Sequence, residues 1–120
     1  MFETVHPIVG ALDLARSIDF YTNQLGFELA FQDSADNPNY VGLRRGQVLL
    51  HMQFQYDYEM SPIRLRFRVA DADELYSEFV KRGVEITEAG IHDTAWCSRE
   101  FALWDQDKNA LTFFHFLPTS

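Results

Sequence analysis

Acidic side chains and aromatic rings lie next to one another in two polar segments of this sequence. In the segment 33–40, DSADNPNY, Asp33 and Asp36 come shortly before Tyr40. In the segment 54–60, FQYDYEM, two carboxylates alternate with two tyrosines. Rings stack on the flat apolar body of a ligand, and carboxylates attract its positive charge. The pattern favours binding of a planar, cationic small molecule.

Three large rings are placed where they could contact such a ligand. Phe31 ends an apolar run, Tyr40 follows the polar loop 33–39, and Trp96 ends the loop IHDTAW. A large ring beside a polar loop is exposed unless it packs into the core or serves recognition. We expect Phe31, Tyr40 and Trp96 to contact ligand, with core packing as an equal alternative for Trp96.

Nucleophilic catalysis finds little support. The only cysteine, Cys97, follows Trp96, and His92 lies five residues before it, a spacing that does not by itself pair a base with a nucleophile. A free cysteine more often behaves as a small hydrophobic residue. A single cysteine also excludes an intramolecular disulfide and fits a reducing compartment.

Charge and hydropathy exclude several classes of partner. The 120 residues carry a net charge of −8, which argues against nucleic acid and anionic membranes. No apolar run reaches the roughly 18 residues of a membrane span, and the N-terminus is acidic rather than basic. We expect a cytoplasmic protein with no nucleic-acid or membrane partner.

The elements that position these side chains follow one order twice. In the first half, residues 2–12 are β-rich, Asp13 caps a helix that ends at Gly26, and strands are expected at 27–32, 40–45 and 47–54. In the second half, a strand at 63–69 is followed by a helix from Asp71 to Gly83 and by strands at 84–90, 98–104 and 110–116. GFEL at 26–29 and GVEI at 83–86 mark a repeat of about 57 residues.

This order predicts a single α+β domain over residues 1–120, made of two βαβββ modules. We place module 1 at about 1–55, a hinge at 56–60 and module 2 at about 61–118. Neither half can bury both faces of its own sheet, so the two halves must pack together or pair with another chain. We expect curved mixed sheets around a cleft, with both helices outside.

The last two strands are joined by a turn without glycine, Asp105-Gln106-Asp107-Lys108-Asn109. Asp and Asn side chains accept hydrogen bonds from nearby backbone N–H groups and so stabilise turns. We assign Asp105 and Asp107 to turn structure rather than catalysis, and expect Asn109 to adopt the left-handed conformation.

The helix–Gly–Phe junction RSIDFYTNQLGFEL and the final hairpin REFALWDQDKNALTFF resemble the vicinal-oxygen-chelate superfamily. This group includes glyoxalase I, extradiol dioxygenases and bleomycin-resistance proteins. The likeness covers nearly the whole chain and is greatest to the bleomycin-binding proteins, through LRFRVADADELYSEF and the run from Trp96 to Asn109. The resemblance implies a two-fold homodimer with its ligand sites in clefts at the dimer interface.

Enzymes of the superfamily hold a divalent metal at four places, which the resemblance maps onto His6, His51, Arg64 and Thr112. Only the two histidines are competent ligands, because a guanidinium cannot ligate and repels a cation. His115 has the wrong strand parity to replace Thr112. Arg64 is instead a candidate anion-binding group, although it alternates with Arg66 and Arg68 in what is equally a solvated charged stripe.

We therefore expect a metal-free protein that sequesters a drug-like, cationic aromatic ligand, without catalytic residues or cofactor. The expected ligand-binding residues are Phe31, Asp33, Tyr40, His51, Arg64, Trp96 and Thr112. Two alternatives stay open: a divalent-metal enzyme of the lyase, thiol-transferase or dioxygenase type that uses His6 and His51, and a binding module for an endogenous metabolite.

Overall fold

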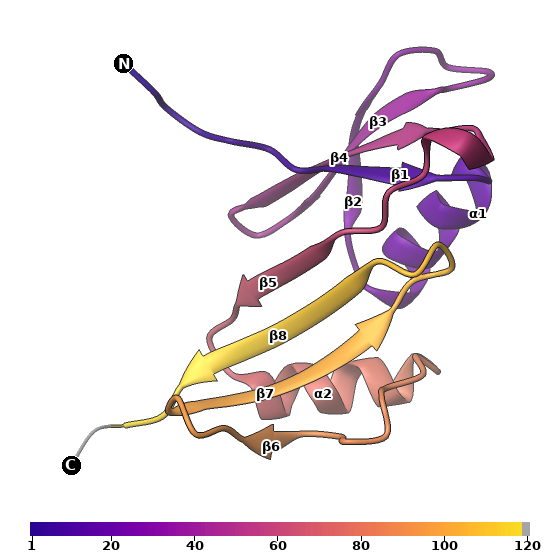
Figure 1. Cartoon of the computed structure of the whole chain (residues 1–120). Helices are drawn as coiled ribbons and strands as arrows, with labels where there is room; N and C mark the ends of the chain where they lie inside the picture. Colours follow the sequence, from indigo (N-terminus) through magenta and orange to yellow (C-terminus); the bar gives the residue numbers. More distant parts are fainter. Residues whose placement is uncertain (119–120) are drawn as a thin grey trace. The chain divides into compact units, whose positions relative to one another are not determined.

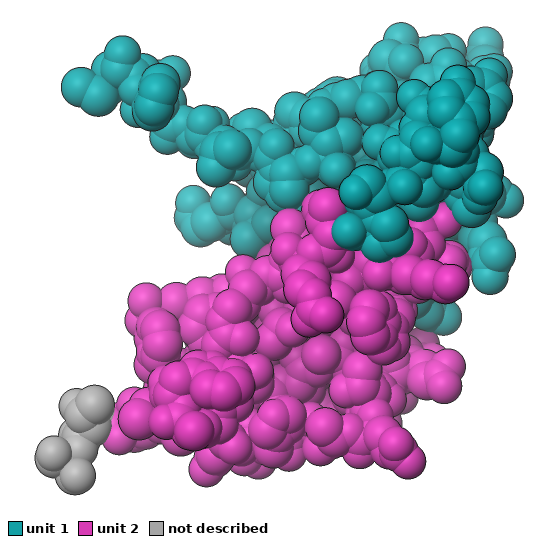
Figure 2. All heavy atoms as spheres, viewed as in Figure 1, with its two compact units in different colours: residues 1–62 teal, residues 63–120 magenta. Residues whose placement is uncertain are grey.

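The computed structural model describes residues 1–118 and divides the chain into two compact units with the same strand order (Figure 1). The first unit spans Met1–Pro62 and the second begins at Ile63, as coloured in Figure 2. Their sheets have the orders β1-β4-β3-β2 and β5-β8-β7-β6. The internal repeat and the α+β class are confirmed: each unit pairs one mixed four-stranded sheet with an α-helix.

The elements of the first unit are β1 (Ile8–Ala11), α1 (Leu14–Asp19), the π-helical turn η1 (Phe20–Gln24), β2 (Glu28–Gln32), β3 (Tyr40–Arg45), β4 (Val48–Phe54) and the 3₁₀ turn η2 (Asp57–Glu59). Strand β1 runs parallel to β4, and the other pairs are antiparallel. As expected, the Asp13 side chain caps α1 by accepting the Arg16 backbone N–H at 3.1 Å. The chain leaves η1 through Gly26 at φ 76°, a conformation that glycine adopts without steric cost.

The elements of the second unit are β5 (Arg64–Arg68), α2 (Ala72–Lys81), β6 (His92–Asp93), β7 (Ser98–Trp104) and β8 (Ala110–Phe116). Asp71 caps α2 through the Glu74 N–H at 3.1 Å. Helix α2 lies along one face of the sheet (Figure 1), where Phe79 meets the Phe101 and Phe113 rings edge-on at 5.9 and 5.3 Å between centroids. Because these three rings are at most 3 % exposed, they form the core of this unit.

The strand expected at 84–90 does not form. A single ladder-like hydrogen bond joins the Thr87 N–H to the Ala102 carbonyl at 3.0 Å, and a turn then closes from the Gly90 N–H to the Thr87 carbonyl. That turn redirects the chain, so the two-residue strand β6 pairs with β7 instead, His92 with Glu100 and Asp93 with Arg99. The alternation in VEITEAG was therefore a misleading signal.

The glycine-free turn between β7 and β8 is built as predicted in one respect and differently in another. One Asp105 carboxylate oxygen accepts the backbone N–H groups of Asp107 and Asn109, and the other accepts the Asn109 side-chain amide. The assignment of Asp105 to turn structure is confirmed. The left-handed residue is Lys108, at φ 65°, and not Asn109, because Asn109 is engaged by Asp105 and accepts the Ile63 N–H.

Within residues 1–118, no helix combines the length and apolar character that crossing a bilayer requires.

Candidate functional site

The rings expected to contact ligand in the first unit gather on one face of its sheet. Paired residues in a sheet share a face, and Gly42 pairs with both His51 and Phe31, while His51 also pairs with Ile8. Tyr40 lies two residues before Gly42 and so faces the same side. His6 precedes β1 rather than lying within it, yet its ring reaches this face. We call His6, Phe31, Tyr40 and His51 the histidine–aromatic surface.

The four rings of this surface contact one another around His51. The His6 and His51 rings stack in parallel, with centroids 4.8 Å apart and an interplanar angle of 5°. Phe31 and Tyr40 meet His51 edge-on at 5.3 and 5.4 Å and lie 6.4 Å from each other. Phe31 remains 42 % exposed. The arrangement offers a ligand both flat ring faces and polar ring edges.

Gly42 makes room for this cluster. A Cβ atom built at Gly42 would overlap the Phe31 ring, so any other residue would displace that ring from the sheet. The glycine is required here for close approach and not for its backbone dihedral angles, which are those of an ordinary strand. The sequence carried this signal as a glycine inside YVGLRR, but only the register shows that Phe31 fills the space.

Hydrogen bonds fix both imidazoles. The Tyr40 hydroxyl lies 2.7 Å from His51 Nδ1, and His6 Nδ1 lies 3.0 Å from the Leu49 carbonyl oxygen. Since that carbonyl only accepts, His6 carries a proton on Nδ1. Desolvation, followed by the nearby His6, lowers the pKa of His51 below its ordinary value of 6.5. His51 is therefore neutral at pH 7 and adds no positive charge to the surface.

Asp33 supports this surface through the backbone of the loop that leads to Tyr40. One of its carboxylate oxygens accepts the backbone N–H groups of Asn39 and Tyr40 at 2.9 and 3.2 Å. The side chain thus closes the loop 33–40 and positions Tyr40 at the start of β3. The carboxylate thus lies at the backbone of Tyr40, whose ring belongs to the surface, and its negative charge favours a cation there.

The other three expected ligand residues, Arg64, Trp96 and Thr112, belong to the second unit. The β5–β8 register places Arg64, Arg66 and Thr112 on the face of the sheet opposite α2. Trp96 is 62 % exposed in the loop before β7 and is not a core residue. The structure thus groups the seven expected residues into two sets, one on each unit.

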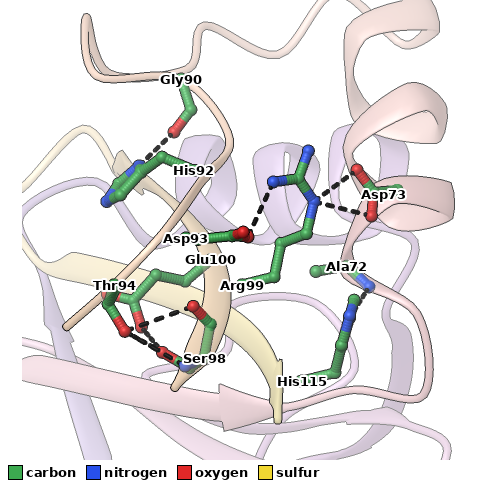
Figure 3. A network of polar contacts seen from close by, with 10 residues as sticks. All are labelled: Ala72, Asp73, Gly90, His92, Asp93, Thr94, Ser98, Arg99, Glu100 and His115. Atoms are coloured by element: carbon green, nitrogen blue, oxygen red, sulfur yellow. Dashed lines mark hydrogen bonds and ion pairs between the residues drawn. The ribbon is translucent and has the colours of Figure 1, made fainter. Parts of the chain in front are cut away.

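Sequence reasoning missed a polar network in the second unit, part of which Figure 3 shows. Glu100 accepts from Arg66 Nη2 at 2.7 Å and from the Ser98 hydroxyl at 2.8 Å, and Ser98 in turn meets Thr94. Burial alone would raise the pKa of Glu100, but the hydrogen bonds from Arg66 and Ser98, the Arg66 charge and a bond from the Trp96 indole lower it overall. Glu100 is therefore ionised at neutral pH and pairs with Arg66.

Further ion pairs and caps lie on the α2 side of this sheet. Arg99 bridges Asp73 at the start of α2 and Asp93 on β6, both at 2.9 Å (Figure 3). His115 Nδ1 accepts the Ala72 N–H at 2.8 Å and so caps the same helix end. These contacts hold α2 against its sheet, and His115 faces away from Thr112 as its parity predicts.

The residues at the metal-ligand places do not suit a divalent cation. In the first sheet His51 on β4 pairs with Ile8 on β1. In the second sheet Thr112 on β8 pairs with Arg66 on β5, so Thr112 holds the place that His51 holds in the first sheet. Arg64, two residues before Arg66, likewise matches His6. Among residues 1–118, no group of three or more His, Cys, Asp or Glu side chains is arranged to hold a metal. A pair of stacked imidazoles without a carboxylate is an incomplete ligand set.

The chain is similar to known proteins along most of its length. Residues 4–113 match the model of the Glyoxalase/Bleomycin resistance protein/Dioxygenase superfamily. The two mixed sheets, each covered by a helix, and the paired module order are the architecture of that class. The chain belongs to this superfamily.

Particular relatives are bleomycin resistance proteins. The chain is similar to the "Bleomycin resistance protein" of Geobacillus stearothermophilus, with 26 % identity over 90 % of this chain and 92 % of that protein. The structure resembles the bleomycin resistance determinant encoded on transposon Tn5, with TM-score 0.78, 23 % identity and 96 % and 98 % of the two chains covered. It also resembles the bleomycin-binding protein of Streptomyces verticillus complexed with copper(II)-bleomycin, with TM-score 0.70, 22 % identity and 99 % and 100 % covered.

Proposed function

We propose that this protein binds and sequesters a large, basic, heteroaromatic molecule of the bleomycin type, without chemical conversion. The observation that carries the proposal is the histidine–aromatic surface, where Phe31, Tyr40 and the neutral His51 lie in mutual contact. The similarity to bleomycin resistance proteins along 90 % of the chain supports the same ligand class.

The chemistry of the surface fits such a ligand. A flat heteroaromatic group can stack on Phe31 or Tyr40, and one of its amide or amine groups can hydrogen-bond His51 Nε2, since the Tyr40 hydroxyl engages Nδ1. Positive charge on the ligand is favoured by Asp33 and by the net charge of −8. Nothing in the surface supplies a nucleophile with its base, so retention of the ligand is the simplest activity.

Calorimetric titration with metal-free and copper(II)-bleomycin tests the proposal. We expect saturable binding at one site per chain, and the Phe31→Ala change should weaken it by about tenfold, since a base–aromatic stack contributes roughly 1–3 kcal/mol. Leu29→Ala is a matched control: Leu29 is on the same strand and 43 % exposed, but pairs with Leu43 on the opposite face.

The controls separate binding from folding. The free energy of unfolding of both variants should lie within about 1 kcal/mol of that of the parent protein, because neither side chain is fully buried. Absence of bleomycin binding at high micromolar concentration, or equal losses in both variants, would contradict a bleomycin-type site on this surface.

We further propose that the protein acts without a metal and as a two-fold homodimer whose ligand sites lie in clefts at the dimer interface. Arg64 and Thr112 at two of the four ligand places support the first statement, and the resemblance to the superfamily supports the second. Native mass spectrometry measures both: we expect a mass near twice 14.0 kDa and well under one equivalent of Zn, Ni, Mn or Fe. Stoichiometric metal that is lost on His6→Ala or His51→Ala would revive the metalloenzyme alternative, and a strict monomer would refute the dimer.

A further inference from the structure

The second acidic–aromatic segment of the sequence, residues 54–60, forms a surface of its own. Phe54 is three residues from His51 on β4, and successive strand residues alternate in direction, so the Phe54 ring lies on the α1 side of the sheet. Its ladder partner Ala11 and the preceding residue on that side, Met52, are fully buried. The segment 54–60 thus starts on the face opposite the histidine–aromatic surface.

Three rings of this segment rise from the core into solvent. Phe54 is half-buried and meets the Tyr56 ring edge-on with centroids 4.9 Å apart, and Tyr56 stacks on Tyr58 at 5.7 Å with an interplanar angle of 5°. Tyr56 is 58 % exposed and Tyr58 is 85 % exposed. We call Phe54, Tyr56 and Tyr58 the aromatic ladder. A flat group cannot enter between the two tyrosines, since that would need about 7 Å, so it must stack on the open face of Tyr58.

Contacts with β1 and within η2 hold the ladder in place. The Gln55 N–H donates to the last carbonyl of β1 at 2.9 Å. The Gln55 and Met60 side chains lie against Gly10, where a Cβ atom would overlap Gln55. The Glu59 N–H donates to the Tyr56 carbonyl, and a Glu59 carboxylate oxygen accepts the Tyr56 N–H, both at 2.8 Å. A partner therefore meets rings that are already ordered, which lowers the entropic cost of binding.

Negative charge accompanies the ladder without a neutralising cation. Asp57 and Glu59 flank Tyr58 and are exposed, and the sequence has no lysine or arginine between Arg45 and Arg64. Within residues 1–118, neither carboxylate forms an ion pair, and the Asp57 carboxylate has no hydrogen bond. The faces of aromatic rings are also negative, so the rings and the carboxylates attract the same positive charge.

The shape of the ladder selects the kind of ligand. A small molecule binds in a concave site that surrounds most of it, whereas these rings project into solvent. A projecting ring contributes to binding when a second macromolecule covers it, and tyrosine and arginine are enriched among the residues that dominate such interfaces. A guanidinium is flat, stacks on a ring face and bonds a carboxylate with two parallel N–H groups, which the ammonium of lysine cannot do.

From these features we propose that the aromatic ladder is a docking surface for an arginine-containing, basic segment of a partner protein. The arginine stacks on Tyr58 and pairs with Asp57, and the adjoining residues of the segment lie along Tyr56. The proposal does not depend on the ligand of the histidine–aromatic surface, because the two surfaces start on opposite faces of the sheet.

Nuclear magnetic resonance with short peptides tests the docking surface. The protein, labelled with nitrogen-15, is titrated with acetyl-Gly-Arg-Gly-Arg-Gly-amide and with the matching lysine and citrulline peptides, since citrulline has the shape of arginine without its charge. We expect the arginine peptide to shift the backbone amide signals of residues 56–60 saturably. The lysine peptide should bind about threefold more weakly and the citrulline peptide about tenfold more weakly. Salt at about 0.5 M should weaken binding of the arginine peptide.

Variants assign the binding to individual groups. Tyr58→Ala should weaken binding of the arginine peptide about tenfold and Tyr58→Phe less than about twofold, because the ring and not its hydroxyl makes the contact. Asp57→Asn should weaken it about fivefold. Asp36→Asn is the matched control, since it removes the same charge from an exposed position without a printed partner in the loop 33–40, and it should change binding less than about twofold. Tyr58→Ala should bind bleomycin as the parent protein does.

Several outcomes would overturn the proposal. They are equal binding of the arginine and citrulline peptides, equal losses in Asp57→Asn and Asp36→Asn, or no saturable shift at about 5 mM peptide. Shifts centred on Tyr40 and His51 would also do so, because they would place the peptide on the histidine–aromatic surface. Shifts of residues 56–60 that follow protein concentration without peptide would show that a second copy of the chain, and not a partner protein, covers the ladder.

Discussion

Replacing Asp105 with alanine should lower the free energy of unfolding by about 3 kcal/mol, because buried N–H groups would lose their acceptor at a typical cost of 1–3 kcal/mol each. The Asp105 carboxylate accepts three hydrogen bonds, two from the backbone of the turn and one from the Asn109 amide. Asp105 is 7 % exposed and Asn109 is 1 % exposed, so water cannot fully replace these bonds. Urea unfolding followed by circular dichroism measures the loss.

The effect should extend beyond the turn. Asn109 also accepts the Ile63 N–H at 3.0 Å, and the Ala110 N–H donates to the Ile63 carbonyl at 2.9 Å. The turn between β7 and β8 thus orders the start of β5. Asn109→Ala should therefore cost about as much as Asp105→Ala, and the double variant should cost less than the sum, because the two side chains share one hydrogen bond.

Two further variants test the assignment. Asp105→Asn keeps one acceptor oxygen but sets its NH₂ group against a donor, so it should lose an intermediate amount of stability. Lys108→Gly should instead stabilise the protein by about 1 kcal/mol, since a non-glycine residue at φ 65° carries a steric cost of that size. If Asp105→Ala lowers the free energy of unfolding by less than about 1 kcal/mol, the turn does not stabilise the sheet as described.

The repeat, the helix starts and most strands could be predicted because their signals are local. Asp13 and Asp71 cap helices through their own side chains, and Gly26 and Gly83 adopt positive φ where the helical segments end. The prediction of a strand at 84–90 was wrong. The alternation of apolar and polar residues indicates only which side chains would face the core if a strand formed. It does not measure whether a neighbouring strand supplies hydrogen bonds, and here a turn at Gly90 intervenes.

The sites depended on register, which the sequence does not fix. Phe31, Tyr40 and His51 could each be proposed as ligand contacts, but their meeting requires Gly42 to pair with both Phe31 and His51. Asp33 was expected to meet ligand directly, and the structure shows it also closing the loop that positions Tyr40.

The neutral state of His51 gives ligand binding a defined pH dependence. Desolvation and the stacked His6 lower the pKa of His51 below 6.5, so the imidazole stays neutral down to that pH and becomes a cation only in more acidic solution. A protonated His51 ring would repel a cationic ligand. Both of its ring nitrogens would also carry a proton, so Nδ1 could no longer accept a hydrogen bond from the Tyr40 hydroxyl. Binding of a cation should therefore be constant from pH 8 to 6.5 and fall below that range.

The same shift affects folding. The unfolded chain takes up a proton on His51 near pH 6.5, whereas the folded chain does so only at lower pH, so the unfolded state binds more protons in this interval. Stability contributed by the neutral His51 is thus fully present above pH 6.5 and decreases as the pH falls toward the folded-state pKa. Unfolding experiments at each pH must accompany the binding measurements.

Fluorescence titration with thioflavin T, an aromatic cation whose charge does not change with pH, measures the binding effect. One coupled proton permits at most a tenfold loss of affinity per pH unit below the His51 pKa, and we expect a total loss of about tenfold between pH 6.5 and pH 5. His51→Gln keeps a hydrogen-bonding side chain without a titrating group, and it should bind less tightly at pH 7 but with a flatter pH profile. An unchanged pH profile in His51→Gln would show that His51 does not govern the loss. Affinity that rises on acidification would exclude a cationic ligand at this surface.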